Sequence, residues 1–169
     1  MLANAGLTYD DVIKVPAPNV AASARDFASG KSDVLFFALG SGKVMEVAAK
    51  VGGLRVLPVD ASPEAVARLH KVNPDVYVTV ANPAPNVVGI TKPTNVCAID
   101  VVLFTNAGVP DEVIYKIMKG IYENKADLEN SFKPFGLFDV KRMATPIEGV
   151  PFHPGAIKFY KEIGLLPAK

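Results

Sequence analysis

Residues 33–51, DVLFFALGSGKVMEVAAKV, contain the pattern that decides the fold. The first part, 34–39, is a continuous apolar run, which is typical of a strand buried on both faces in a parallel sheet. Gly40-Ser41-Gly42 then predicts a tight turn, and a helix is expected over 43–51. A buried strand, a turn and a helix in this order indicate an α/β layer fold.

The same alternation extends to both sides of this stretch. Upstream, the sequence predicts a short strand at 13–16 and a helix over 19–29 that begins at an asparagine cap. Downstream, it predicts a strand at 54–59 and a helix over 62–71, which opens with a serine cap, a proline and an acidic residue. We therefore expect an α/β lobe with a mostly parallel sheet.

The second half of the chain has a different composition and a different pattern of predicted elements. Prolines, asparagines and a glycine at 82–95 predict a crossing or linker segment between packed elements. Residues 96–105 then predict a strand. The longest helix is expected over 110–128, where apolar residues recur at helical spacing and would pack one face onto a core. A last helix is predicted at 154–163.

Composition argues against several classes of function. Half of the 169 residues are hydrophobic and 21% are charged, as in a well-packed globular protein. The 18 basic and 17 acidic residues nearly balance, which argues against a nucleic-acid or membrane-surface protein. The single cysteine, Cys97, has apolar neighbours and is interpreted as a small buried side chain. His70 and His153 show no ligand spacing, so neither a metal nor a cofactor is expected.

Gly40-Ser41-Gly42-Lys43 invites comparison with a phosphate-binding loop. That loop would need a glycine at 37 and a serine or threonine after the lysine, whereas this sequence has Phe37 and Val44. Nucleotide binding is therefore disfavoured. The free backbone N–H groups at a helix N-terminus would still favour an anion such as a substrate carboxylate. A simple glycine turn explains the same residues, and both interpretations stay open.

Asp100 is a lone carboxylate in an apolar predicted strand, where an unpaired charge would be costly. It is either a hydrogen-bonded structural group or a ligand contact near a cleft. Tyr77 and Thr105 stand at ends of predicted strands, where open α/β sheets place ligands. We see no nucleophile elbow and no histidine with a serine or cysteine partner in sequence, so no enzymatic activity is expected. The candidate ligand-binding residues are Phe37, Gly40, Ser41, Gly42, Tyr77, Asp100 and Thr105.

Three segments carry a resemblance to a known family. The ending, 151–164 (PFHPGAIKFYKEIG), together with 113–128, is similar to the ending of TAXI-family TRAP transporter solute-binding proteins. Residues 28–37 (ASGKSDVLFF) resemble the helix-to-strand step of that family, with Val34 in place of the usual alanine. Within the ending, Pro154 fits the first position of a helix, and Phe152 can pack onto the first turns of that helix as a hydrophobic staple. This motif is therefore interpreted as structural.

The resemblance implies a periplasmic-binding-protein type II fold, in which two α/β lobes close over a solute. It implies a small organic acid or amino acid such as glutamate as ligand, an ion-gradient-driven TRAP permease as partner, and a periplasmic location. Family members begin with a signal peptide and a first lobe, neither of which this chain shows. We therefore expect 1–92 to be a second-lobe α/β segment and 93–169 a return strand with C-terminal helices.

Two rival hypotheses stay open beside this one. One is a stand-alone module that binds a protein partner, and the other is an α/β enzyme of unknown reaction. Without a first lobe, apolar surface on the helix at 110–128 and on the final helix is expected to lie uncovered, which would favour self-association.

Overall fold

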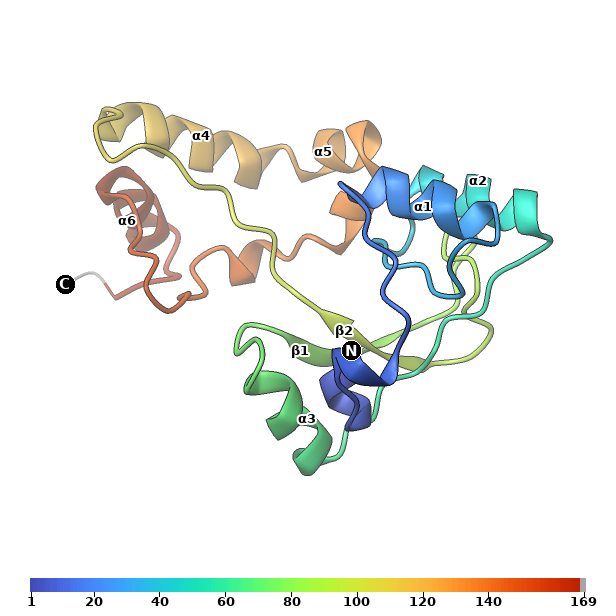
Figure 1. Ribbon diagram of the computed structural model, residues 1–169. Helices are drawn as coiled ribbons and strands as arrows, with labels where there is room; N and C mark the ends of the chain where they lie inside the picture. The colour runs from blue at the N-terminus through green and yellow to red at the C-terminus, as the bar shows by residue number, and fades with distance from the viewer. Residues whose placement is uncertain (168–169) are drawn as a thin grey trace. The chain divides into compact units, whose positions relative to one another are not determined.

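The computed structural model describes residues 1–167, except for the side chains of Lys133 and Pro134. It consists mainly of helices with one small sheet (Figure 1). The helices are α1 (Val20–Ala28), α2 (Gly42–Val51), α3 (Pro63–His70), α4 (Asp111–Glu123), α5 (Lys125–Ser131) and α6 (Pro154–Glu162). Short 3-10 turns occur at Leu2–Ala5, Tyr9–Asp11, Lys133–Leu137 and Val140–Arg142. The strands are β1 (Tyr77–Ala81) and β2 (Thr94–Ala98).

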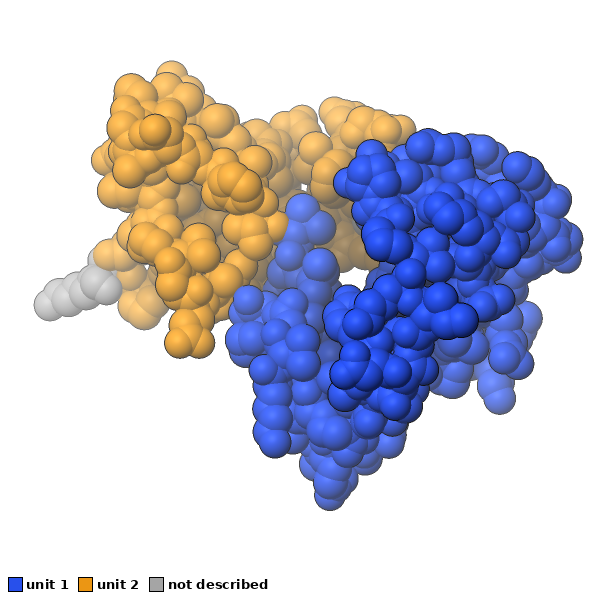
Figure 2. All heavy atoms as spheres, in the orientation of Figure 1, with its two compact units in different colours: residues 1–101 blue, residues 102–169 orange. Residues whose placement is uncertain are grey.

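The chain forms two compact units, Met1–Val101 and Val102–Lys169, each with its own internal contacts (Figure 2). The first unit holds α1 to α3 and both strands, and the second holds α4 to α6. The assignment of 1–92 and 93–169 to parts of a binding-protein lobe stays a prediction.

The sheet differs from the expected one. β1 pairs with β2 in antiparallel register, from Tyr77 opposite Ala98 to Ala81 opposite Thr94. No parallel sheet occurs in the described residues, so the prediction of a mostly parallel sheet is wrong for this part of the chain. The predicted strands at 13–16, 34–39 and 54–59 are extended chain without a ladder.

The exposure of these segments explains the difference. Ile13 is 95% exposed and Phe36 60%, so the apolar runs have no neighbouring strand to bury them. Residues 54–59 make two separate backbone hydrogen bonds, from the Val56 N–H to the Gly89 carbonyl in the linker and from the Val59 N–H to the Asn95 carbonyl in β2, each 3.0 Å. An apolar run indicates which segment can enter a sheet, but a strand forms only where a partner strand completes the ladder.

The predicted strand at 96–105 is also shorter than expected. β2 ends at Ala98, opposite the first residue of β1, and no strand continues the pairing beyond it. The following residues are extended and largely exposed, with Val101 91% and Phe104 84% exposed. Asp100 therefore lies outside β2 and is exposed, which corrects its placement within an apolar strand. Cys97 is half-buried in β2.

The helices of the first unit begin where the caps predict. Asn19 Oδ1 accepts a hydrogen bond from the Ala22 N–H at 2.9 Å, and Ser62 Oγ accepts one from the Ala65 N–H at 3.4 Å. Each bond satisfies a donor that the helix itself leaves unpaired. α1 packs against α2 through small buried residues, Ala22, Ala24, Val44, Val47 and Ala48.

The N-terminal turn is held to α3 by polar contacts. Asn4 is 3% exposed, and its side chain donates to the Asp60 carbonyl and accepts from the Asp60 N–H at 2.8 and 2.9 Å. Arg68 on α3 donates to the backbone carbonyls of Ala3 and Asn4. The reciprocal pair makes Asn4 a structural residue of the first unit.

The second unit has its core between α4 and α6. The buried residues are Ile114, Met118, Ala144, Ala156, Phe159 and Tyr160. The expected helix over 110–128 is in fact two helices, because Asn124 leaves helical geometry (φ −116°, ψ 36°) and its side chain donates to the Gly120 carbonyl. α6 begins as predicted, with Pro154 first and the Phe152 ring packed 5.4 Å from that of Tyr160.

Candidate functional site

The turn before α2 presents backbone donors. Gly40 has φ 75°, a left-handed conformation that favours glycine, and Ser41 follows as the buried N-cap of α2. Ser41 Oγ accepts from the Val44 N–H at 3.3 Å. In the part of the chain that the structure describes, the backbone N–H groups of Gly42 and Lys43 have no acceptor. They lie at the positive end of the helix dipole, where an anion is favoured.

Asn86 adds a side-chain amide beside the same turn. A Cβ placed on Gly40 would lie 3.2 Å from Asn86 Nδ2, so the two residues are in close contact. Asn86 comes from the linker at 82–95 and is half-buried. The sequence did not indicate this residue, because an asparagine in a proline-rich segment is typical of turns and its contact with Gly40 is tertiary.

Tyr77 and Asp100 are brought together at one end of the hairpin. The Tyr77 hydroxyl donates to Asp100 Oδ1 at 3.1 Å. Tyr77 opens β1, and Asp100 follows the end of β2 by two residues. The antiparallel register places these positions side by side, although they are 23 residues apart. Asp100 is thus an exposed, hydrogen-bonded carboxylate, a geometry that fits either of its two interpretations.

The remaining candidates lie apart from these groups. Phe37 is half-buried in the extended segment before the turn. Thr105 is exposed and belongs to the second compact unit, in the segment that precedes α4. The structure therefore forms two groups from the seven candidates, the turn at 40–42 and the pair of Tyr77 with Asp100.

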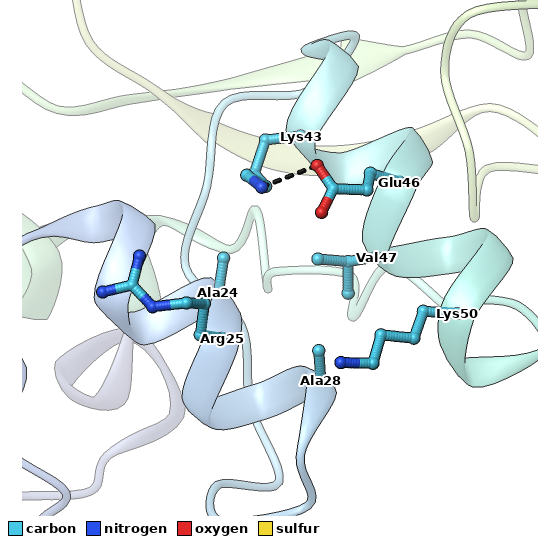
Figure 3. Close-up of a pocket in the computed structure, with 7 residues that line it drawn as sticks. All are labelled: Ala24, Arg25, Ala28, Lys43, Glu46, Val47 and Lys50. Carbon is cyan, nitrogen blue, oxygen red and sulfur yellow. Dashed lines mark hydrogen bonds and ion pairs between the residues drawn. The ribbon is translucent and has the colours of Figure 1, made fainter.

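Two recesses in the described residues lie elsewhere. One is an open hollow of about 370 Å³ lined by Tyr9, Lys14, Val15 and Pro16. The other is a small recess of about 40 Å³ between α1 and α2 (Figure 3). The larger one contains none of the candidate residues, and an open hollow of this kind would bury little of a ligand.

Among the described residues, no three histidine, cysteine, aspartate or glutamate side chains are grouped so that they could hold a metal ion. No helix within residues 1–167 has the length and the apolar character needed to cross a membrane.

Comparison with protein families gives a match over nearly the whole chain. The model of the NMT1-like family matches residues 1–164. This is a family of binding proteins, and it includes proteins of the periplasmic solute-binding type.

Proposed function

The chain belongs to the NMT1-like family, and from this premise we propose that it binds a small solute for a TRAP-type transporter. The family match over residues 1–164 is the observation that carries the proposal. It covers both the turn before α2 and the hairpin. The ending at 151–164, which resembles that of TAXI-type receptors, supports the transporter role, an extracytoplasmic location and a membrane permease as partner.

The donors around the turn suggest a carboxylate-bearing ligand. The N–H groups of Gly42 and Lys43 would donate to the carboxylate at the positive end of α2, and the Asn86 amide would add a donor from the linker. Ser41 holds the first turn of the helix in place for this contact.

The second group would make a separate polar contact, at the end of the hairpin away from the linker that carries Asn86. Asp100 would accept hydrogen bonds from an ammonium group, with Tyr77 fixing the orientation of its carboxylate. Phe37, half-buried in the segment before the turn, would supply an apolar contact. The ligand class that we propose is a small organic acid or an amino acid such as glutamate, whose carboxylate the turn before α2 would bind.

Proline at position 42 tests the backbone contact. Gly42 is the first residue of α2, where a helix needs no N–H and tolerates proline. Ser41 has φ −76° and ψ 145°, as a residue before proline requires, and a Cβ on Gly42 meets nothing within 4 Å. Gly42→Pro should therefore keep the fold and remove one hydrogen bond to the carboxylate. We expect a loss of about 1.5–3 kcal/mol in binding, roughly tenfold or more in affinity.

Thermal shift and calorimetry with glutamate, aspartate and succinate provide the measurement. A ligand at 100 times its Kd should add ~2.7 kcal/mol of stability to the unaltered chain. Val20→Pro is the matched control, since Val20 is the exposed first residue of α1 and no candidate lies near it in sequence. A Gly42→Pro chain that binds as tightly as the control would refute the backbone contact. Absence of a shift with all three solutes would refute the binding function.

We also propose that the chain self-associates. Val101 and Phe104 are almost fully exposed in the extended segment after β2, and Val113 and Ile117 on α4 are more than 40% exposed. Apolar chain with an unpaired backbone is a template for pairing with another copy. Light scattering should show a mass that rises with concentration, and Val101→Lys with Phe104→Lys should lower it. A monomer at every concentration contradicts the proposal.

A further inference from the structure

The recess between α1 and α2, called here the α1–α2 recess, has an apolar floor and a charged rim. Ala24 and Val47 are buried on the two helices and form the floor. The rim carries Arg25 from α1 and Lys43, Glu46 and Lys50 from α2 (Figure 3).

The charges on this rim do not balance. Lys43 Nζ lies 2.6 Å from Glu46 Oε2, so this pair is neutral. Among the described residues, no carboxylate lies within ion-pair distance of Arg25 or Lys50. The nearest acid in sequence to Arg25, Asp26, is paired with Lys31 at 3.3 Å. Two positive charges therefore remain on the rim, although the whole chain carries a net charge of only +1.

The positions of the two cations are different. Lys50 extends between the helices toward Ala28, whereas the Arg25 guanidinium lies back along α1 (Figure 3). Lys50 is thus in place at the opening, and Arg25 would swing across the rim to reach a ligand. Both side chains are exposed, so their attraction for an anion depends on the two cations acting together on one ligand.

We propose that the α1–α2 recess binds a small oxyanion group, a phosphate or a carboxylate, through Lys50 and Arg25. The volume of about 40 Å³ admits a group of a few atoms and excludes a whole amino acid. The recess uses side chains on the flank of α2, whereas the proposed solute contacts use the backbone N–H groups of Gly42 and Lys43 and the side chain of Asn86. Guanidinium and ammonium groups are the side chains that bind such oxyanions. The proposal does not rest on the solute-binding function.

Titration with inorganic phosphate and, separately, with acetate tests the site and distinguishes the two ligand groups. Backbone amide NMR spectra of the full chain are recorded while phosphate or acetate replaces chloride, so that the ionic strength stays constant. We expect saturable shifts confined to α1 and the second half of α2, larger with the preferred anion. Shifts at Gly42 and Asn86 alone, or no saturable shift with either anion, would overturn the proposal.

Three variants test whether the charges on the rim determine the affinity for the anion. Lys50→Gln should weaken anion binding by about fivefold, because it removes the cation at the opening. Glu46→Gln should strengthen binding by a similar factor, because it removes the carboxylate on the rim and releases Lys43. Lys116→Gln is the control and should leave binding unchanged, because Lys116 is an exposed residue of α4 whose Nζ lies 3.9 Å from Glu112 Oε1. Equal effects of Lys50→Gln and Lys116→Gln would refute a localised site.

Discussion

Gly155→Ala is expected to destabilise the second unit by about 2–3 kcal/mol, although alanine is the better helix former. Gly155 is the second residue of α6 and is buried where the helix meets the start of α4. A Cβ at this position would overlap the backbone carbonyl of Asp111. A backbone carbonyl cannot change rotamer as a side chain can, so α6 would have to move away from α4. The contact between these helices forms the core of the unit, and it would loosen along its length.

Gly120→Ala provides a control with the opposite sign. Gly120 lies inside α4, and a Cβ there meets nothing within 4 Å. The same substitution should therefore stabilise the chain by about 0.5–1 kcal/mol through helix propensity alone. Urea denaturation of both variants measures the two effects. If Gly155→Ala also stabilises the chain, then α6 does not approach α4 as closely as the structure shows.

The sequence predicted the helices better than the sheet because the two depend on different ranges of interaction. Asn19 and Ser62 each cap a helix through a hydrogen bond from the N–H group three positions further on. The capping residue and the helix start that it determines therefore lie in the same short segment. The break between α4 and α5 at Asn124 was missed because apolar residues continue beyond it and only the backbone angles of Asn124 depart from helical values. Strands need partners that are distant in sequence. The apolar run at 34–39 was predicted to be a buried strand, but it joins no ladder and its Phe36 is 60% exposed.

The candidate site shows the same contrast. The turn at 40–42 and the cap at Ser41 follow from local residue types, and the structure places them at the start of a helix as expected. Tyr77 and Asp100 were each selected for their own position, and only the hairpin register brings them into hydrogen-bond contact. Asn86 carried no sequence signal. Its contact with Gly40 depends on how the linker folds back, which no local pattern encodes.

The second large effect is expected from Phe159→Ala, which should cost about 3–5 kcal/mol. Phe159 is 1% exposed and lies at the centre of the α4–α6 core. The rings of Tyr115 and Tyr122 meet it edge-on, with centroids at 5.8 and 5.6 Å. Alanine would leave a cavity beneath both tyrosines and remove these aromatic contacts, and backbone held on two helices can collapse only partly into that space.

Tyrosine fluorescence during urea denaturation is a suitable measurement for this variant. The chain has no tryptophan, and three of its five tyrosines, Tyr115, Tyr122 and Tyr160, lie in the second unit around Phe159. Leu137→Ala is the control: its side chain is 86% exposed, and its loss should change the free energy of unfolding by less than about 0.5 kcal/mol. Equal losses in the free energy of unfolding for the two variants would contradict the placement of Phe159 in the core. A large cost for Phe159→Ala alone would mean that the family-like ending at 151–164 contributes to stability through this ring, as its structural interpretation requires.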